Sequence, residues 1–106
     1  PLQIGYRVGS RHPLTLGAAG IAILAERPSH PEEGEAIKQA RLDGYSLTHG
    51  QLQRGAVGVA SAISSTSFRP TIEACVGVVA MEDLDKETAI TEVKAAAQRI
   101  AELIAR

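Results

Sequence analysis

The chain of 106 residues lacks an excess of either charge, because eleven Lys and Arg stand against twelve Asp and Glu, for a net charge of -1 at pH 7. No basic residues cluster into a stripe that could neutralise a run of phosphates, so this segment is not expected to bind DNA itself. Long apolar runs are also missing, and none approaches the roughly 20 residues of a membrane-spanning helix. We therefore expect a cytoplasmic chain that contacts no membrane.

Cysteine occurs once, at Cys75, so an internal disulfide is impossible. Its apolar neighbours Ala74 and Val76 favour a buried thiol in a reducing compartment. The three histidines have neither HExxH-like nor Cys-paired spacing, and the serines lack the strained elbow and base of a nucleophile. We therefore expect no catalytic residue, no metal site and no cofactor. An enzyme that uses Cys75 with a histidine stays open as a third alternative.

The spacing of apolar residues, together with Pro, Gly and Asp at positions typical of helix ends, predicts three helices. The first covers residues 16–26, is rich in Ala and Gly, and follows a loop over residues 10–15 that contains Pro13. The second begins with Pro31 at its first position and ends near Asp43, with Gly44 as its C-terminal cap. The third is a long amphipathic helix that follows Asp85 as its N-cap. Its apolar residues recur at three- and four-residue spacing, at Ile90, Val93, Ala97, Ile100 and Ile104.

Alternation of side chains predicts the strands. Residues 2–8 alternate as in a half-buried strand, a second strand begins at Tyr45, and two more cover residues 57–63 and 72–81. The last two are joined by a hydroxyl-rich turn over residues 64–70, so they should form an antiparallel pair. The expected fold class is α+β, with one antiparallel sheet, flanking helices and a single core.

Three stretches carry a more specific pattern. Residues 9–20 combine a Gly-x-Arg-x-Pro-Leu loop with an Ala/Gly-rich helix start, residues 44–60 open on a Gly-Tyr strand entry, and residues 74–80 form an apolar strand. In this order and spacing they resemble the effector-binding domain of IclR-type bacterial transcription regulators, from Gly5 to about Ile104. The resemblance implies a GAF/PAS-like sheet with flanking helices. It also implies that residues 1–106 are one domain, most of an effector-binding domain, with a winged helix-turn-helix expected upstream.

The resemblance implies a ligand site between the sheet and the helices on one of its faces, where family members bind a small organic acid. By position, backbone N–H groups at Gly17, Ala18 and Ala19 would receive the carboxylate of that acid. The helix dipole and the free N–H groups of a helix N-terminus attract an anion, and small side chains let it approach. The alternative is that an Ala/Gly-rich helix merely packs closely on a sheet.

The sequence departs from the family at the remaining polar positions. Thr48 and His49 stand where acidic residues are usual, Gly58 where Cys is common, and Gly77 and Val79 where a Ser-x-Ser pair is usual. Unless other side chains move in, these changes make the site wider and less polar. A larger, more apolar acid should then fit better than a two- or three-carbon acid, which needs hydrogen-bond partners to replace its water shell.

The expected function is that of the ligand-sensing and oligomerising domain of a bacterial transcription regulator, binding a carboxylic acid or a more apolar related effector. The alternative is a dimerisation module with a vestigial pocket closed by Leu47, Leu14 or Met81. DNA would be contacted only through the missing N-terminal domain, and self-association would give a dimer or tetramer. The expected effector-contacting residues are Gly17, Ala18, Ala19, Thr48, Gly58, Gly77 and Val79.

Overall fold

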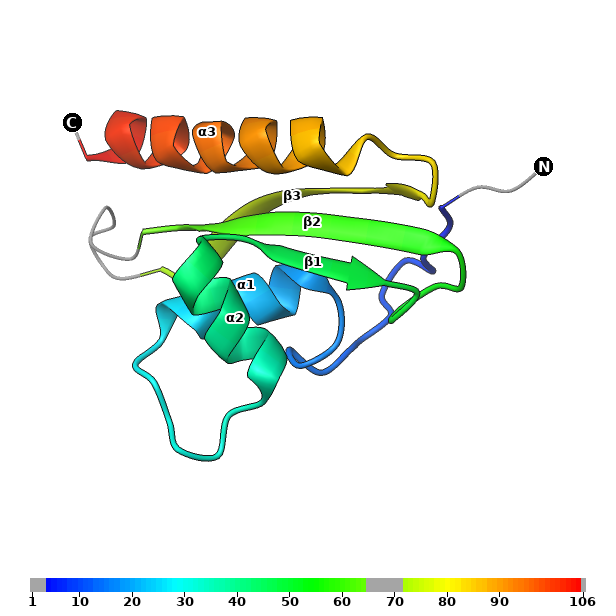
Figure 1. Cartoon of the computed structure of the whole chain (residues 1–106), viewed down its shortest axis with the longest axis horizontal. Helices are drawn as coiled ribbons and strands as arrows, with labels where there is room; N and C mark the ends of the chain where they lie inside the picture. The colour runs from blue at the N-terminus through cyan, green and yellow to red at the C-terminus, as the bar shows by residue number, and fades with distance from the viewer. Residues whose placement is uncertain (1–3, 65–71, 106) are drawn as a thin grey trace.

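The computed structural model describes residues 4–64 and 72–105 and arranges them as three helices and three strands. In chain order they are α1 (Ala18–Glu26), α2 (Glu35–Asp43), β1 (Ser46–His49), β2 (Ala56–Ile63), β3 (Ala74–Met81) and α3 (Lys86–Ile104). The strands pair antiparallel in the order β1-β2-β3. The sheet is a middle layer, with α3 along one face and α1 and α2 against the other (Figure 1). The predicted α+β class and long C-terminal helix are confirmed.

The core lies on both faces of the central strand, β2. Val59 packs with Ala89 and Val93 of α3 on one face. Its neighbour Ala60 packs with Ala18 of α1 on the other, because successive side chains of a strand point to opposite faces. Two helical layers therefore cover β2, and the α1 layer approaches the sheet through residues no larger than alanine. The predicted antiparallel pair of β2 and β3 is confirmed over eight residue pairs.

The predicted N-cap of the C-terminal helix is confirmed at Asp85. Its carboxylate accepts hydrogen bonds from the Thr88 backbone N–H, at 3.2 Å, and from the Thr88 hydroxyl, at 2.8 Å. These bonds hold the pKa of Asp85 below its usual range. The buried face of α3 consists of Ala89, Val93 and Ala97. The predicted apolar face is therefore confirmed at Val93 and Ala97, whereas Ile90 and Ile100 are half-buried and Ile104, at the end of the helix, is exposed.

The second helix begins later than predicted. Its first residue is Glu35, with Gly34 as N-cap, and Pro31 lies in a turn instead of the first helical turn. Arg41 explains the difference, because its guanidinium binds the Glu33 carboxylate and donates at 3.1 Å to the backbone carbonyl of Ala25. These contacts hold the chain before the helix against the end of α1. The predicted C-cap is confirmed, since Gly44 has φ 80°, in the left-handed region that favours glycine.

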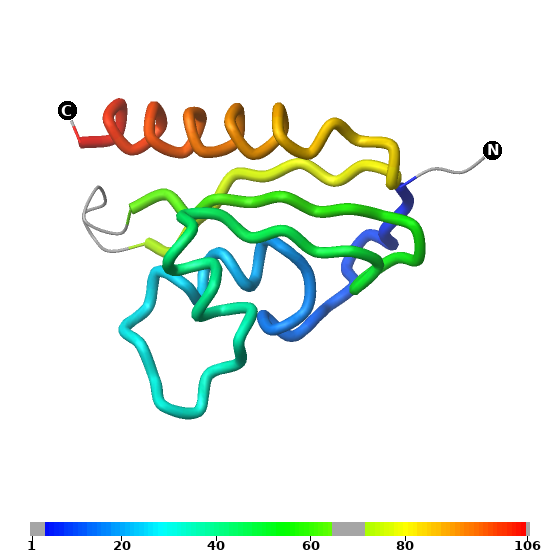
Figure 2. Tube along the Cα trace, in the orientation of Figure 1, coloured from blue at the N-terminus to red at the C-terminus, as the bar shows by residue number. Residues whose placement is uncertain are grey.

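The strand predicted over residues 2–8 is wrong for its described part, residues 4–8, which have no regular structure. Alternating apolar and polar side chains give a segment two different faces, but a strand also needs a neighbouring strand whose backbone it can pair with. Here the Gly5 N–H donates instead to the side-chain oxygen of Gln53, at 3.1 Å. Figure 2 shows this N-terminal segment beside the turn between β1 and β2, at one end of the sheet. The turn predicted over residues 64–70 lies outside the described residues, apart from Ser64.

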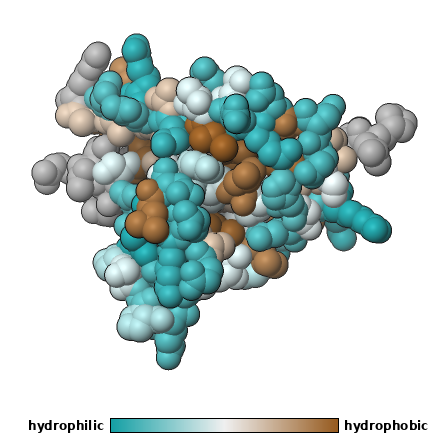
Figure 3. Space-filling view, in the orientation of Figure 1, coloured by the Kyte–Doolittle hydropathy of each residue, from teal (hydrophilic) through white to brown (hydrophobic). Residues whose placement is uncertain are grey.

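The face of the molecule shown in Figure 3 is mostly hydrophilic, with apolar side chains exposed between polar ones. Within residues 4–64 and 72–105, no helix combines the length and apolarity needed to cross a membrane.

Candidate functional site

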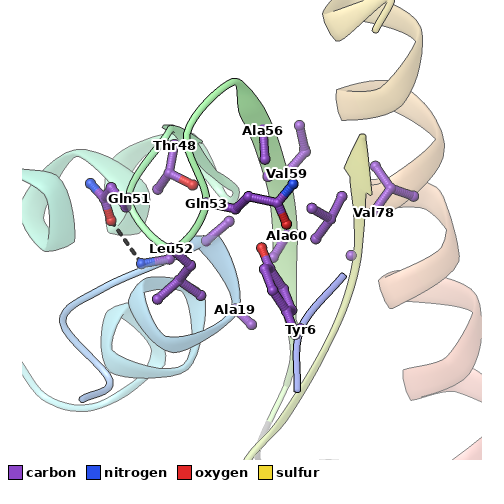
Figure 4. A pocket seen from close by; sticks show the side chains of 15 residues that line it. Tyr6, Ala19, Thr48, Gln51, Leu52, Gln53, Ala56, Val59, Ala60 and Val78 are labelled. Atoms are coloured by element: carbon purple, nitrogen blue, oxygen red, sulfur yellow. Dashed lines mark hydrogen bonds between the residues drawn. The ribbon is translucent and has the colours of Figure 1, made fainter. Parts of the chain in front are cut away.

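A cavity of about 210 Å³ lies beside the start of α1, between the β1–β2 turn and the facing parts of β2 and β3 (Figure 4). It is smaller than the roughly 300–1,000 Å³ of pockets for drug-sized ligands, so it suits a small molecule. The structure brings all of the sequence-predicted site residues to its wall. They are Gly17, Ala18, Ala19, Thr48, Gly58, Gly77 and Val79.

Strand register explains this convergence. Thr48 of β1 pairs with Gly58 of β2, and Gly58 pairs in turn with Val79 of β3. Directly paired residues of antiparallel strands project from the same face of a sheet. The neighbouring pair is Ala60 with Gly77, and Ala60 packs against α1. These residues therefore form a floor that faces the start of α1.

Gly58 allows the helix to come close to this floor. A Cβ built on Gly58 would lie 3.1 Å from both the Ala18 Cβ and the Thr48 hydroxyl oxygen. The cysteine that is common at this position in the resembled family would crowd both neighbours. The floor opens to solvent on the β3 side, where Gly77 and Val79 are exposed.

The start of α1 offers backbone donors to the cavity. The Gly17 N–H donates to the side-chain oxygen of Gln51 at 2.7 Å, drawn as the dashed line in Figure 4. Ala18 and Ala19 follow in the first helical turn, where N–H groups have no partner within the helix. No hydrogen bond joins these two N–H groups to any other part of the chain that the structure describes. Their donors, together with the helix dipole, make this end of the cavity suitable for an anion.

Thr48 adds a polar side chain to the floor. It is 7% exposed, and its hydroxyl makes no hydrogen bond to any residue in 4–64 or 72–105. Its neighbour on the same face, Ser46, is satisfied, because its hydroxyl donates to the Ala18 carbonyl at 2.6 Å. The Thr48 hydroxyl reaches the cavity (Figure 4) and keeps free donor and acceptor capacity for a bound molecule.

His49, the other residue at the acidic positions of the family, points away from the cavity. Its Nδ1 lies 3.0 Å from a carboxylate oxygen of Glu82. This follows from strand alternation, since Thr48 and His49 are adjacent and face opposite sides of the sheet.

Sequence reasoning missed eight residues of the wall, namely Tyr6, Gln51, Leu52, Gln53, Ala56, Val59, Ala60 and Val78. Gln51, Leu52 and Gln53 belong to the turn between β1 and β2, which the sequence marked only as a polar stretch between Thr48 and Arg54. Polar composition does not show that a turn folds back over a sheet. The residues proposed to fill a vestigial pocket, Leu14, Leu47 and Met81, do not line this cavity in the described part of the chain.

Charged side chains are absent from the described part of the cavity wall. Among the described residues it contains no Asp, Glu, Lys, Arg or His, so a ligand's negative charge would be met by backbone N–H groups. Cys75 packs nearby against the cluster of Ala18, Ala22 and Ala60. Burial raises the pKa of the Cys75 thiol, which disfavours the reactive thiolate. Within the described residues, no group of three or more His, Cys, Asp or Glu could hold a metal ion.

Among known proteins, the chain is similar to several solved structures. No protein-family model matches the sequence, and no curated protein matches it. The repressor BlcR of Agobacterium tumefaciens is similar with a TM-score of 0.72 and 21% identity, over 95% of this chain and 51% of its own. The C-terminal domain of a transcriptional regulator from Vibrio cholerae has a TM-score of 0.71 and 19% identity, over 92% of this chain and 69% of its own.

An IclR transcriptional regulator from Alicyclobacillus acidocaldarius has a TM-score of 0.70 and 17% identity, over 99% of this chain and 50% of its own. This chain therefore spans about half the length of that regulator and of BlcR. Identities this low show the fold alone. The chain has the fold of IclR-type transcriptional regulators, which in the Vibrio cholerae protein is that of a C-terminal domain.

Proposed function

We propose that this chain is the ligand-sensing domain of a bacterial transcription regulator and that the cavity at the start of α1 binds a small organic acid. The observation that carries the proposal is the convergence of the Ala18 and Ala19 N–H groups with the unpartnered Thr48 hydroxyl on one cavity. A carboxylate at this end would meet helix donors, the positive end of the dipole and a hydroxyl. The fold shared with transcriptional regulators supports the same function.

The rest of the wall favours an apolar body for the acid. Leu52 and Val79 give the cavity apolar side chains, and no hydroxyl side chain stands at position 77 or 79. A very small 2-oxo acid would lose part of its water shell here without gaining enough partners. A linear or branched acid of medium length would place its carboxylate at α1 and its carbon chain along Val79.

The domain assignment extends the proposal to the longer protein. Residues 1–106 would make up most of an effector-binding domain, and a winged helix-turn-helix elsewhere in the polypeptide would contact DNA. The whole would work in the cytoplasm as a regulator and not as an enzyme. Binding of the acid would change the regulator's affinity for its operator through these two domains.

A second candidate function is self-association. It is favoured by exposed apolar side chains in β3 and just before it. Ile72 is 51% exposed, Val78 is 40% exposed and Val79 is 44% exposed. β3 is also an edge of the described sheet, and an apolar edge strand is a surface on which another chain can pair. A dimerisation module needs this surface but not an occupied cavity, so the two candidates can be separated.

Calorimetric titration with hexanoate and with pyruvate tests the first candidate, with thermal unfolding as a second readout. Hexanoate should bind more tightly than pyruvate, and at a hundred times its Kd should add about 2.7 kcal/mol to the free energy of unfolding. Thr48→Val should weaken binding, because it removes the hydroxyl and keeps the side-chain shape.

Ser61→Ala is the matched control. It removes another buried hydroxyl, which donates to the Gly44 carbonyl at 2.8 Å and lies on the α3 face of β2. The control should lose stability but keep hexanoate affinity. If no acid binds while sedimentation equilibrium shows a dimer, the chain is a dimerisation module and the sensing function is wrong.

A further inference from the structure

The turn between β1 and β2 already touches the place where an acid would bind. Three consecutive residues of this turn, Gln51, Leu52 and Gln53, line the cavity. The Gln51 side-chain oxygen lies 2.7 Å from the Gly17 backbone nitrogen, although the two residues are 34 positions apart in sequence. An amide oxygen is a neutral acceptor of the same kind as a carboxylate oxygen. Gln51 therefore satisfies the first N–H at the start of α1 from within the protein.

Two further contacts fix the turn against its surroundings. Leu52 lies over Gly17, so close that a Cβ on Gly17 would be 2.7 Å from the Leu52 Cδ1. Gln53 accepts the hydrogen bond from the Gly5 N–H at 3.1 Å. One side of the turn is thus attached to the helix start, and the other side is attached to the N-terminal segment. Figure 4 shows Gln51 and Leu52 beside the helix, and Gln53 beside Tyr6.

We propose that Gln51 is an internal competitor of the effector, bound to Gly17 in the empty protein and displaced when an acid occupies the start of α1. The inference rests on the proposed function, because it needs the acid at this helix. The unpartnered Thr48 hydroxyl, 7% exposed, provides the incoming acid with a partner that Gln51 does not use. Release of Gln51 would free the turn and, through Gln53, the segment that contains Gly5.

The competitor lowers the observed affinity. A carboxylate that takes the Gly17 N–H together with those of Ala18 and Ala19 can bind only the fraction of molecules in which Gln51 has left Gly17. Removing the Gln51 amide should therefore improve binding, which is unusual for a residue in a ligand cavity. A residue that merely contacted the ligand would weaken binding when truncated, so the sign of the effect decides between the two roles.

Titration of the wild type, Gln51→Ala and Gln98→Ala with hexanoate shows whether removal of the Gln51 amide strengthens or weakens binding. Gln51→Ala should bind hexanoate about 2- to 10-fold more tightly, the range expected for the release of one hydrogen bond. Gln98→Ala removes the same kind of side chain from an exposed position of α3 that does not line the cavity, so its affinity should stay unchanged. Weaker or equal binding by Gln51→Ala overturns the competitor role, while hexanoate binding by the wild type still supports the sensing function.

A tethered carboxylate provides a measurement that does not depend on hexanoate. In Gln51→Glu the new carboxyl should settle at Gly17, so its pKa, followed by carbon NMR, should lie below the usual value of about 4.3. The same variant should lose hexanoate binding by at least tenfold, while Gln98→Glu, which adds the same charge outside the cavity, should retain it. An ordinary pKa overturns the contact at the helix start. If no protein binds hexanoate, the sensing function and the displacement both fail, and the pKa still reports where position 51 lies.

Discussion

Gly77 of β3 lies so close to β2 that a Cβ built on it would be 2.6 Å from the carbonyl oxygen of Val59. The same Cβ would lie 3.0 Å from the Cβ of Ala60, its partner in the strand register. The clash is with backbone and cannot be relieved by a rotamer change. The absence of a serine at position 77 is therefore part of the local strand spacing, and not only a change in the polarity of the cavity.

Gly77→Ala is expected to destabilise the fold by about 1 to 3 kcal/mol, because the added methyl forces the two strands apart. Val79→Ser, two residues along the same face, should lose less than about 1 kcal/mol, since Val79 is 44% exposed. Urea unfolding of both variants measures the difference. Equal losses would show that β3 does not approach β2 as closely as described.

Val93→Ala is expected to destabilise the protein by about 1.5 to 3 kcal/mol. Val93 is 3% exposed and packs with Val59 on the α3 face of the sheet, so truncation removes buried apolar atoms and leaves a small void. Leu103→Ala is the control on the same helix, because Leu103 is 47% exposed and its truncation should change little. Unfolding of both by guanidinium tests the assignment of the buried face.

The free energy of unfolding should fall at acid pH because the ion pair between Arg27, at the end of α1, and Glu73 is lost. Glu73 receives two hydrogen bonds from Arg27, at 2.6 and 2.7 Å, and these lower the pKa of Glu73 in the folded state. A lowered folded pKa gives a contribution that is present above the unfolded value of about 4.3 and is lost as pH falls through the folded value. Unfolding free energies from pH 7 to pH 3 should therefore decline less in Glu73→Gln than in the wild type. Parallel curves would mean that the pair forms no effective interaction in solution.

Arg41 should not be replaceable by lysine. Its guanidinium binds both oxygens of Glu33 and donates to the carbonyls of Ala25 and Arg27, which a single ammonium cannot match. Arg41→Lys should lower the melting temperature nearly as much as Arg41→Ala. Lys38→Ala, which removes only an exposed contact with Glu35 at 3.4 Å, should have the smallest effect. A lysine variant as stable as wild type would show that charge alone holds the loop before α2.

The same guanidinium explains one failure of sequence reasoning. Pro31 and the acidic residues after it have the composition of a helix start, and local propensity places the helix there. The helix begins at Glu35 because Arg41, six residues further on, binds Glu33 and keeps it in the loop. Local signals predicted the C-cap at Gly44 correctly, because left-handed backbone is a local property.

The candidate site could be predicted in part for a similar reason. Thr48, Gly58 and Val79 were placed together by motif position, and strand register does bring them into one row across the sheet. Gln51 and Leu52 could not be placed, since nothing in a polar stretch tells how a turn folds over its own sheet. Residues 4–8 failed as a strand because the alternation of side chains does not supply a partner edge.

Gly17 and Leu52 provide the last test, because they join the turn to the helix start. Gly17 has φ 88° and ψ 155°, a conformation open almost only to glycine, and a Cβ built on it would lie 2.7 Å from the Leu52 Cδ1. Gly17→Ala should cost about 1 to 3 kcal/mol from the backbone alone, and more from the clash with Leu52.

In a Leu52→Ala background the clash is relieved and only the backbone cost is left. A double-mutant cycle should therefore show a coupling of about 0.5 to 3 kcal/mol, with the double variant more stable than the sum of the single losses predicts. Gly50→Ala, in the same turn, has no side chain of Leu52 near its built Cβ and should be additive with Leu52→Ala. Additivity of Gly17→Ala with Leu52→Ala would place the turn away from the helix, and with it the competitor at Gln51.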